Sequence, residues 1–194
     1  MTQPLLSNCN GYNLESLHLD TLATLPGFIY IKSLTSDYLW SNLNLAHRAL
    51  GIDSTDTLEG STDFDFHWKL YADHMRENDQ RVIKSRNALH TNEHCQRPDG
   101  TAYRLITHKI PLYKNTKLSG LLGISYERPV NQLQLLLTPR EQSCIALMMQ
   151  GLSDKEIAVR LTISRRTIES HFNSAKIKLR VKTRAQLIVC FCDE

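Results

Sequence analysis

The chain has 194 residues, of which 41% are hydrophobic and 22% are charged, and it carries a formal net charge of +3; these values are typical of a globular protein with one large or two small domains. No apolar run approaches the roughly 18 residues that a membrane span needs, and residues 1–13 lack the basic start and apolar core of an export signal. Together with five cysteines that form no C-x-x-C pair, this favours a cytoplasmic protein with free thiols over a membrane or exported one.

The N-terminal part begins with a polar stretch, residues 1–21, which we interpret as a tail or lead-in because proline, asparagine and glycine interrupt it. Aromatic and β-branched residues then predict two strands joined as a hairpin, at 27–32 and 37–42. Apolar spacing predicts a short helix from Leu43 to Ile52. The polar residues 53–63 are expected to form a loop.

Helix and strand patterns continue after this loop. A charged helix is expected over residues 71–85, with Met75, Val82 and Ile83 on its buried side. Strand patterns dominate after it, and two strong turn sequences divide them into three segments: 87–95, 102–113 and 118–127. These segments predict a three-stranded antiparallel meander.

Four helix starts follow one another at short intervals in the last third of the chain. Thr138 and Glu141 form a complete capping box, with Pro139 at the first helical position. The pattern, in full or with the N-cap alone, recurs at three further places: Ser153–Glu156, Ser164 and Thr183–Gln186. These starts predict four short helices: 138–150, 153–161, 164–179 and 183–192.

The third of these helices has two different faces. Apolar residues recur on one face at steps of four, three and four and can pack on the second helix: Ile168, Phe172, Ala175 and Leu179. Because only Thr162 and Ile163 separate the two helices, these must cross steeply, as in a helix-turn-helix. The opposite face carries hydrogen-bonding and cationic groups that a major groove about 12 Å wide can admit: Arg166, Glu169, Ser170, Asn173 and Lys176.

Charge is distributed unevenly along the chain. Residues 138–194 hold ten Lys and Arg against six Asp and Glu, whereas the remaining residues hold thirteen against fourteen. The basic excess therefore lies in the helical module, as binding to DNA phosphates requires. A small helical bundle with a solvated basic face is the alternative interpretation.

The module resembles the LuxR/GerE (NarL-type) helix-turn-helix in four segments that span about fifty residues: LTPREQ, QGLSDKEIAVRL, ISRRTIESHF and KLRVKTRAQL. The resemblance implies that the third helix enters the major groove and that the fourth makes a dimer contact. It implies base-edge contacts from Glu169, Ser170 and Asn173. Phosphate contacts are implied for a set of polar and basic residues: Ser164, Arg165, Arg166, Thr167, Lys176 and Lys182.

Two positions depart from the pattern of this family. Glu169 stands where many members carry lysine, and an acid there would prefer a cytosine amino group to the acceptor edge of guanine. Ile177 stands where the family often has a polar residue. The target sequence of relatives therefore cannot be transferred to this chain.

The preceding part resembles a PAS domain over residues 22–127, and four segments carry the resemblance: LPGFIYIKSL, TDFDFHW, RPDGT and IPLYKNTKLSGLLGISYE. It implies a five-stranded antiparallel sheet with helices on one face, as in domains that sense signals, dimerise or hold a ligand. The expected fold class is α+β, with a PAS-like domain at 22–127, a connector helix at 128–137 and an all-α, four-helix helix-turn-helix domain at 138–194. The identity of a ligand does not follow from the fold.

The PAS-like part carries no motif for a particular cofactor. The reactive-cysteine motif of flavin-binding relatives is absent, and a haem or a small metabolite remains without a supporting motif. Several histidines could serve as a haem ligand, although an exposed or satisfied histidine is the commoner explanation and none is assigned: His67, His74, His90, His94 and His108. Because His90 and His94 would share one strand face while Cys95 points to the other, we expect no metal site.

An aromatic set in the same part either lines a ligand cavity or forms the core, and the core is favoured in so small a domain: Phe28, Tyr30, Tyr38, Trp40, Phe64, Phe66 and Trp68. No catalytic triad, phosphate-binding loop or receiver-type acidic cluster is present in the sequence. We therefore expect that the protein is not an enzyme.

A homodimer is expected, because one helix-turn-helix covers little DNA and two half-sites generally supply useful specificity. Two apolar surfaces are predicted to make the contact, one on the connector and one on the last helix: Val130, Leu133 and Leu137, and Leu187, Ile188 and Phe191. A plain connector that packs on the next helix is the alternative for the first surface.

These patterns favour a one-component transcription regulator that binds a palindromic operator, with RNA polymerase as a further candidate partner. A LuxR-type quorum-sensing regulator with an autoinducer domain is one alternative. A PAS adaptor that binds proteins and reads no DNA is another.

Overall fold

The computed structural model describes residues 12–13, 18–50, 58–128 and 136–191. The chain divides into two compact units, Met1–Pro98 with Arg104–Arg128, and Asp99–Tyr103 with Pro129–Glu194. No helix in the described ranges is both long and apolar enough to cross a bilayer. The predicted connector helix, with Val130 and Leu133, falls mostly outside these ranges.

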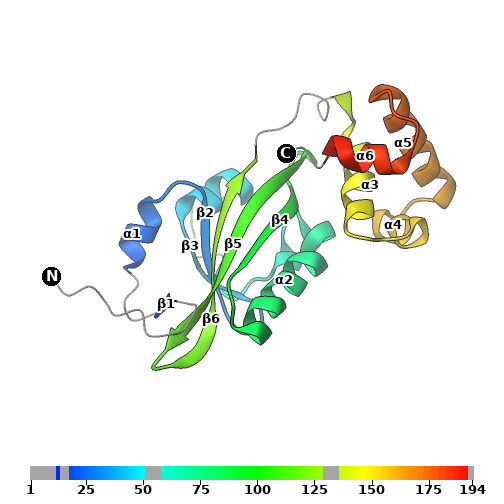
Figure 1. Ribbon diagram of the computed structural model, residues 1–194. Helices are drawn as coiled ribbons and strands as arrows, with labels where there is room; N and C mark the ends of the chain where they lie inside the picture. The colour runs from blue at the N-terminus through cyan, green and yellow to red at the C-terminus, as the bar shows by residue number, and fades with distance from the viewer. Residues whose placement is uncertain (1–11, 14–17, 51–57, 129–135, 192–194) are drawn as a thin grey trace. The chain divides into compact units, whose positions relative to one another are not determined.

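The N-terminal unit is built on an antiparallel sheet whose strands lie in the order β3-β2-β6-β5-β4 (Figure 1). Their bounds are Phe28–Lys32 for β2, Tyr38–Ser41 for β3, Leu89–Gln96 for β4, Ala102–Lys114 for β5 and Lys117–Glu127 for β6. The pairs β2/β3, β2/β6 and β5/β6 are antiparallel. Only five residues join β4 to β5, too few for a parallel crossover. The predicted hairpin and three-stranded meander are therefore confirmed, and they form the five-stranded sheet that the PAS resemblance implies.

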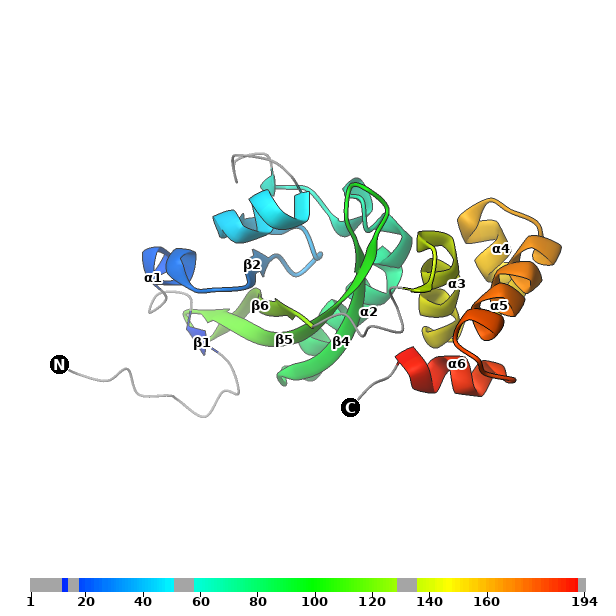
Figure 2. The same ribbon diagram turned by 90° about the horizontal axis from the view of Figure 1, so that it is seen from above.

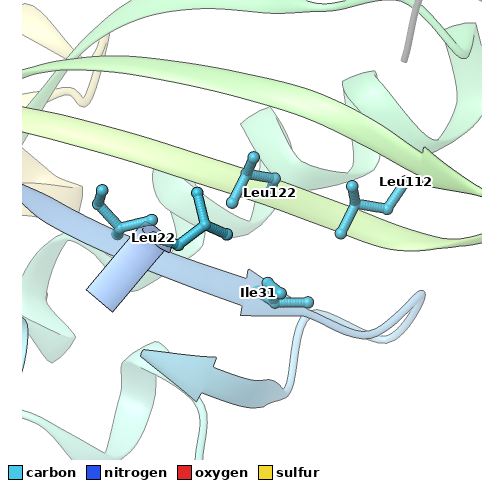
Figure 3. Packing of buried hydrophobic residues seen from close by; sticks show 5 residues of the cluster. Leu22, Ile31, Leu112 and Leu122 are labelled. Atoms are coloured by element: carbon cyan, nitrogen blue, oxygen red, sulfur yellow. The ribbon is translucent and has the colours of Figure 1, made fainter. Parts of the chain in front are cut away.

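Helices lie on both faces of this sheet. The helix α2, Ala72–Ser85, covers one face, together with the single turns η4, Asp63–Asp65, and η5, Lys69–Tyr71. The short helix α1, Leu19–Thr24, lies on the other side of the strands (Figure 1). Its Leu22 packs with Ile31, Leu112 and Leu122 (Figure 3). The expectation of helices on one face only is thus wrong for α1.

The lead-in also contains a strand that the sequence did not predict. The two-residue strand β1, Tyr12–Asn13, pairs in parallel with the end of β5, opposite Leu112 and Tyr113 (Figure 2). Two residues cannot show a strand periodicity, so no pattern in the sequence indicates β1. The short helix expected near residue 43 is present as a π-helical segment, η2, Leu45–Leu50.

The C-terminal unit has the four predicted helices: α3, Pro139–Met149; α4, Asp154–Leu161; α5, Arg165–Lys178; and α6, Arg184–Phe191. All four predicted caps are formed. Thr138 and Ser153 accept from the backbone N–H three residues on, as does Ser164. Thr183 and Gln186 complete the last box, since each side chain accepts from the backbone N–H of the other, at 3.1 Å in both directions.

The core of this unit follows the predicted apolar stripe. Ile168, Phe172 and Ala175 of α5 are buried, and they face α3 and α4, whose Ile145 and Ile157 are also fully buried. After α3 the chain turns at Gly151, whose φ of 87° suits glycine. The three cysteines in the described ranges, Cys95, Cys144 and Cys190, form no disulfide.

Candidate functional site

The helix α5 presents one continuous polar face to solvent. Its buried stripe fixes its rotation, because side chains between the stripe positions must point outward. The exposed side chains include those predicted to touch bases and two of those predicted to touch phosphates: Glu169, Ser170 and Asn173, and Arg165 and Arg166. Thr167 and Lys176 are half-buried at its margins, and Lys182 is exposed just after the helix.

The basic residues on this face form no close ion pair with any described part of the chain. Within the described ranges, no ion pair engages the side chains of Arg165, Arg166, Lys176 or Lys182. The N-cap Ser164 is also exposed, and its hydroxyl lies 2.8 Å from that of Thr167. The N-terminal turn of α5 therefore combines free guanidinium groups with the positive end of the helix dipole, which suits an anion such as a phosphate.

A buried carboxylate ties α5 to the start of α3. Glu141 closes the capping box by accepting from the Thr138 N–H at 2.7 Å. It also accepts from the Ser174 hydroxyl at 2.6 Å and from the Lys178 ammonium at 2.8 Å. Burial alone would raise the pKa of Glu141, but these hydrogen bonds outweigh it and hold the pKa below its usual value. One side chain thus fixes the C-terminal half of α5.

A second contact ties α6 to α4 and α5. The Arg184 guanidinium donates two hydrogen bonds of 2.7 Å to the Asp154 carboxylate, and it lies 4.4 Å from the centre of the Phe172 ring. The hydrogen bonds from Arg184 also lower the pKa of Asp154. Nothing in the sequence pointed to this role of Arg184, because a basic residue in the first turn of a helix gives no sign of its distant partner.

The residues predicted to make a dimer contact differ in their exposure to solvent. Leu137, Leu187 and Phe191 are all buried within their own unit, at 5%, 0% and 4% exposure. The apolar surface of these three residues therefore belongs to the core. The expectation that Leu187 and Phe191 of α6 present apolar surface beyond what the unit buries is thus corrected. Ile188 is half-buried and Val189 is 69% exposed. Ile177, at 78% exposure, is explained by nothing in the structure.

The N-terminal unit buries five charged side chains between its sheet and α2, which we call the buried ion network: Lys32, Asp63, Asp79, Glu93 and Lys109. The Lys109 ammonium lies 2.6 Å from an Asp79 oxygen and 2.7 Å from a Glu93 oxygen. Lys32 pairs with Asp63 and lies 3.1 Å from Asp79. Asp79 therefore bridges lysines from two different strands.

The network also includes neutral hydrogen-bond donors. Tyr38 and Trp68 donate to the same Asp63 oxygen, at 2.8 and 3.1 Å, and the Asn78 amide donates to Glu93 at 3.1 Å. Burial by itself would raise the pKa of Asp79, but the two lysines hold it below its usual value. A buried network linked by this many hydrogen bonds favours one arrangement of sheet and helix.

The aromatic residues predicted to form the core or to line a cavity differ in burial and do not all lie on the same face of the sheet. Phe28, Tyr30, Tyr38 and Trp68 are buried, and Phe66 stacks beside Trp68 with 5.0 Å between ring centres. Phe64, in contrast, is 42% exposed, and Trp40 packs on the opposite face against the Leu22 cluster. Most of the set therefore belongs to the core, and it forms no single lining.

The histidines considered as haem ligands are also dispersed. His94 is buried, its Nε2 has no hydrogen-bond partner within the described ranges, and burial lowers its pKa to about 4. His67 is exposed and His74 half-buried, whereas His90 and His108 lie against each other. The described part of the chain contains no group of three or more His, Cys, Asp or Glu residues that could hold a metal ion.

Comparison with known proteins places the C-terminal unit in a family. The model for bacterial regulatory proteins of the luxR family matches residues 135–191. The spore germination protein GerE of Bacillus subtilis is 43% identical over 58 residues, which make up 30% of this chain and 78% of GerE. The probable transcriptional regulator ycf29 of Cyanophora paradoxa is 37% identical over 90 residues, 46% of this chain. The chain spans only 40% of the length of ycf29.

A solved structure resembles both units together. Vibrio cholerae VqmA, a LuxR-type receptor solved as a dimer in the absence of its target DNA, matches 89% of this chain and 86% of its own with a TM-score of 0.56. At 22% identity, this likeness shows the fold, a PAS-like unit followed by a helix-turn-helix unit. The capped helices, the exposed polar face of α5 and the extensive match to GerE lead to one conclusion: the chain belongs to the LuxR/GerE family of bacterial regulatory proteins.

Proposed function

We propose that the protein is a one-component transcription regulator that binds operator DNA through α5. The observation that carries this proposal is the combination on α5 of an exposed polar face, free arginines in the first turn and two contacts that fix the helix, through Glu141 and Arg184. A reading helix must be held rigidly, because hydrogen bonds to base edges depend on placement to a fraction of an ångström.

The residues have different roles in this proposal. Glu169, Ser170 and Asn173 contact base edges and carry the specificity. The surrounding polar and basic residues contact phosphates and set the register: Ser164, Arg165, Arg166, Thr167, Lys176 and Lys182. Glu169 accepts from a cytosine amino group, so a C·G pair is expected at one position of each half-site.

The N-terminal unit senses a signal, supports dimerisation, or does both. VqmA is a dimer with a target DNA and resembles this chain over both units, which supports a homodimer on two half-sites here. In the dimer, the half-buried Ile188 and the exposed Val189 of α6 are better placed for a contact than the buried Leu187 and Phe191. The site of action is the cytoplasm, and RNA polymerase is a further partner.

Electrophoretic retardation of genomic fragments tests the proposal against that of an adaptor that reads no DNA. The regulator should retain a few fragments in the presence of excess competitor DNA, with an affinity that falls steeply as salt rises. Equal retention of all fragments, or none, would contradict it. The mass and absorption spectrum of protein purified from its own cells would show whether a haem or a metabolite is retained.

A further inference from the structure

Two histidines from neighbouring strands meet on the face of the sheet that points away from α2. On β5, Lys109 points toward α2 and donates to the Met75 carbonyl oxygen at 3.1 Å, so the adjacent His108 points to the opposite face. His90 of β4 lies beside it, with 4.3 Å between the ring centres. Both side chains are exposed, and neither takes part in the contacts proposed for DNA binding.

The separation of their nitrogen atoms suits the chelation of one ion. His90 Nδ1 lies 3.2 Å from Nδ1 and 3.1 Å from Nε2 of His108. Divalent transition metals bind imidazole nitrogen at about 2.0–2.1 Å, so two such ligands are about 2.9 Å apart at a right angle and about 3.3 Å apart at the tetrahedral angle. The observed distances fall between these limits. Rotation about the soft χ2 torsion can aim one nitrogen of each ring at a common point.

His108 lies on a strand that is paired on both sides, and its neighbours on the same face are apolar. Strand β5 pairs with β4 on one side and with β6 on the other. The residue opposite His108 in the register of β6 is Ile124, and its neighbours on the same face of β5 are the half-buried Ile106 and Ile110. Backbone pairing on both sides of β5 limits the movement of His108, and exposure leaves further coordination positions open to water.

We propose that His90 and His108 form a two-histidine site for a divalent transition metal ion of the nickel, copper and zinc class, with water in the remaining positions. A pair of imidazoles without a carboxylate selects against Mg²⁺ and Ca²⁺, which prefer oxygen ligands. The metal takes the place of the hydrogen bond that joins the two rings. The site does not depend on the proposed regulator function, so each can fail without the other.

Calorimetric titration of the untagged full chain with Ni²⁺ tests the site, since Ni²⁺ favours imidazole over oxygen ligands. We expect one ion per chain, and an affinity at least about tenfold weaker in His90→Gln and in His108→Gln, because each removes one ligand. His67→Gln removes an exposed histidine of the same unit and should bind Ni²⁺ as the unchanged protein does. Mg²⁺ should give no binding heat.

Proton NMR of the imidazole groups identifies the ligands independently. The chain has eight histidines, and paramagnetic Ni²⁺ should first broaden the resonances of two, which are those missing from the His90→Gln and His108→Gln spectra. Because both side chains are exposed, the variants should keep the circular dichroism of the parent, so lost binding is not lost folding. Equal Ni²⁺ affinity in all variants, or first broadening of other histidines, would overturn the proposal.

Discussion

Replacement of Lys109 by methionine should strongly destabilise the N-terminal unit. The Lys109 ammonium is fully buried and pairs with Asp79 at 2.6 Å and Glu93 at 2.7 Å. After its removal Asp79 keeps Lys32 at 3.1 Å, whereas Glu93 is left with the neutral amide of Asn78. Loss of one partner from a buried ion pair costs about 3–5 kcal/mol, because the other charge stays buried without compensation. We expect a loss in this range.

Urea unfolding followed by tryptophan fluorescence measures this loss in the correct unit, because both tryptophans of the chain lie there. Addition of Glu93→Gln to Lys109→Met should restore about 1–3 kcal/mol, since it removes the uncompensated carboxylate. Lys114→Met, which changes an exposed lysine of the same strand, should alter stability by less than about 0.5 kcal/mol. A loss under about 1 kcal/mol for Lys109→Met, or a double variant no more stable than the single one, would show that the buried ion network does not stabilise the unit in this way.

Three further groups of predictions concern DNA binding, the α6 contact and pH. Asn173→Ala should weaken binding to the operator by about 1–3 kcal/mol and leave binding to random DNA nearly unchanged. Arg166→Ala should weaken binding to both DNAs and reduce the salt slope by about one. Anisotropy titrations at several salt concentrations distinguish the two variants, and an equal effect of Asn173→Ala on both DNAs would contradict its role in base contacts. Arg184→Ala removes the contact with Asp154, which is partly exposed and so should stabilise α6 by only about 1 kcal/mol. Hydrogen exchange of the α6 amides should therefore become about five- to tenfold faster. Unchanged exchange would mean that the contact contributes nothing to the stability of α6. Burial lowers the pKa of His94 to about 4, against about 6.5 in the unfolded chain, so proton uptake favours the unfolded state. The free energy of unfolding should therefore fall by up to about 3 kcal/mol as the pH drops from about 6.5 to about 4. A His94→Gln variant with the same pH dependence would show that another group is responsible.

Local signals made the C-terminal unit predictable from its sequence. A capping residue such as Thr138 acts on the backbone three positions away, and the apolar stripe of α5 repeats within one helix, so both can be recognised without knowledge of the fold. The rotation of α5, and with it the exposure of Glu169 and Asn173, follows from that stripe. The second role of Glu141 does not, because its partner Lys178 is 37 residues away.

Contacts between distant segments account for what the sequence did not reveal. Lys32 and Lys109 interrupt apolar strand patterns, which marks them as unusual, but their partnership through Asp79 depends on how β2, β5 and α2 are brought together. His90 was weighed as a metal ligand with its strand neighbours, whereas its nearest histidine is on the next strand. The sequence pattern at Leu187 suited a dimer surface as well as a core position, and only its burial in the fold distinguishes the two.

The central claim, that α5 reads base edges, is tested most directly by selection of binding sites from a pool of random duplexes with the full chain and with its Glu169→Lys variant. An acidic side chain accepts from cytosine, and a lysine donates to the acceptor edge of guanine. We predict that both proteins enrich two-fold symmetric sites that differ at one base pair per half-site, with cytosine replaced by guanine on the contacted strand. The same enriched sequence for both proteins, or no enrichment for either, would contradict the account.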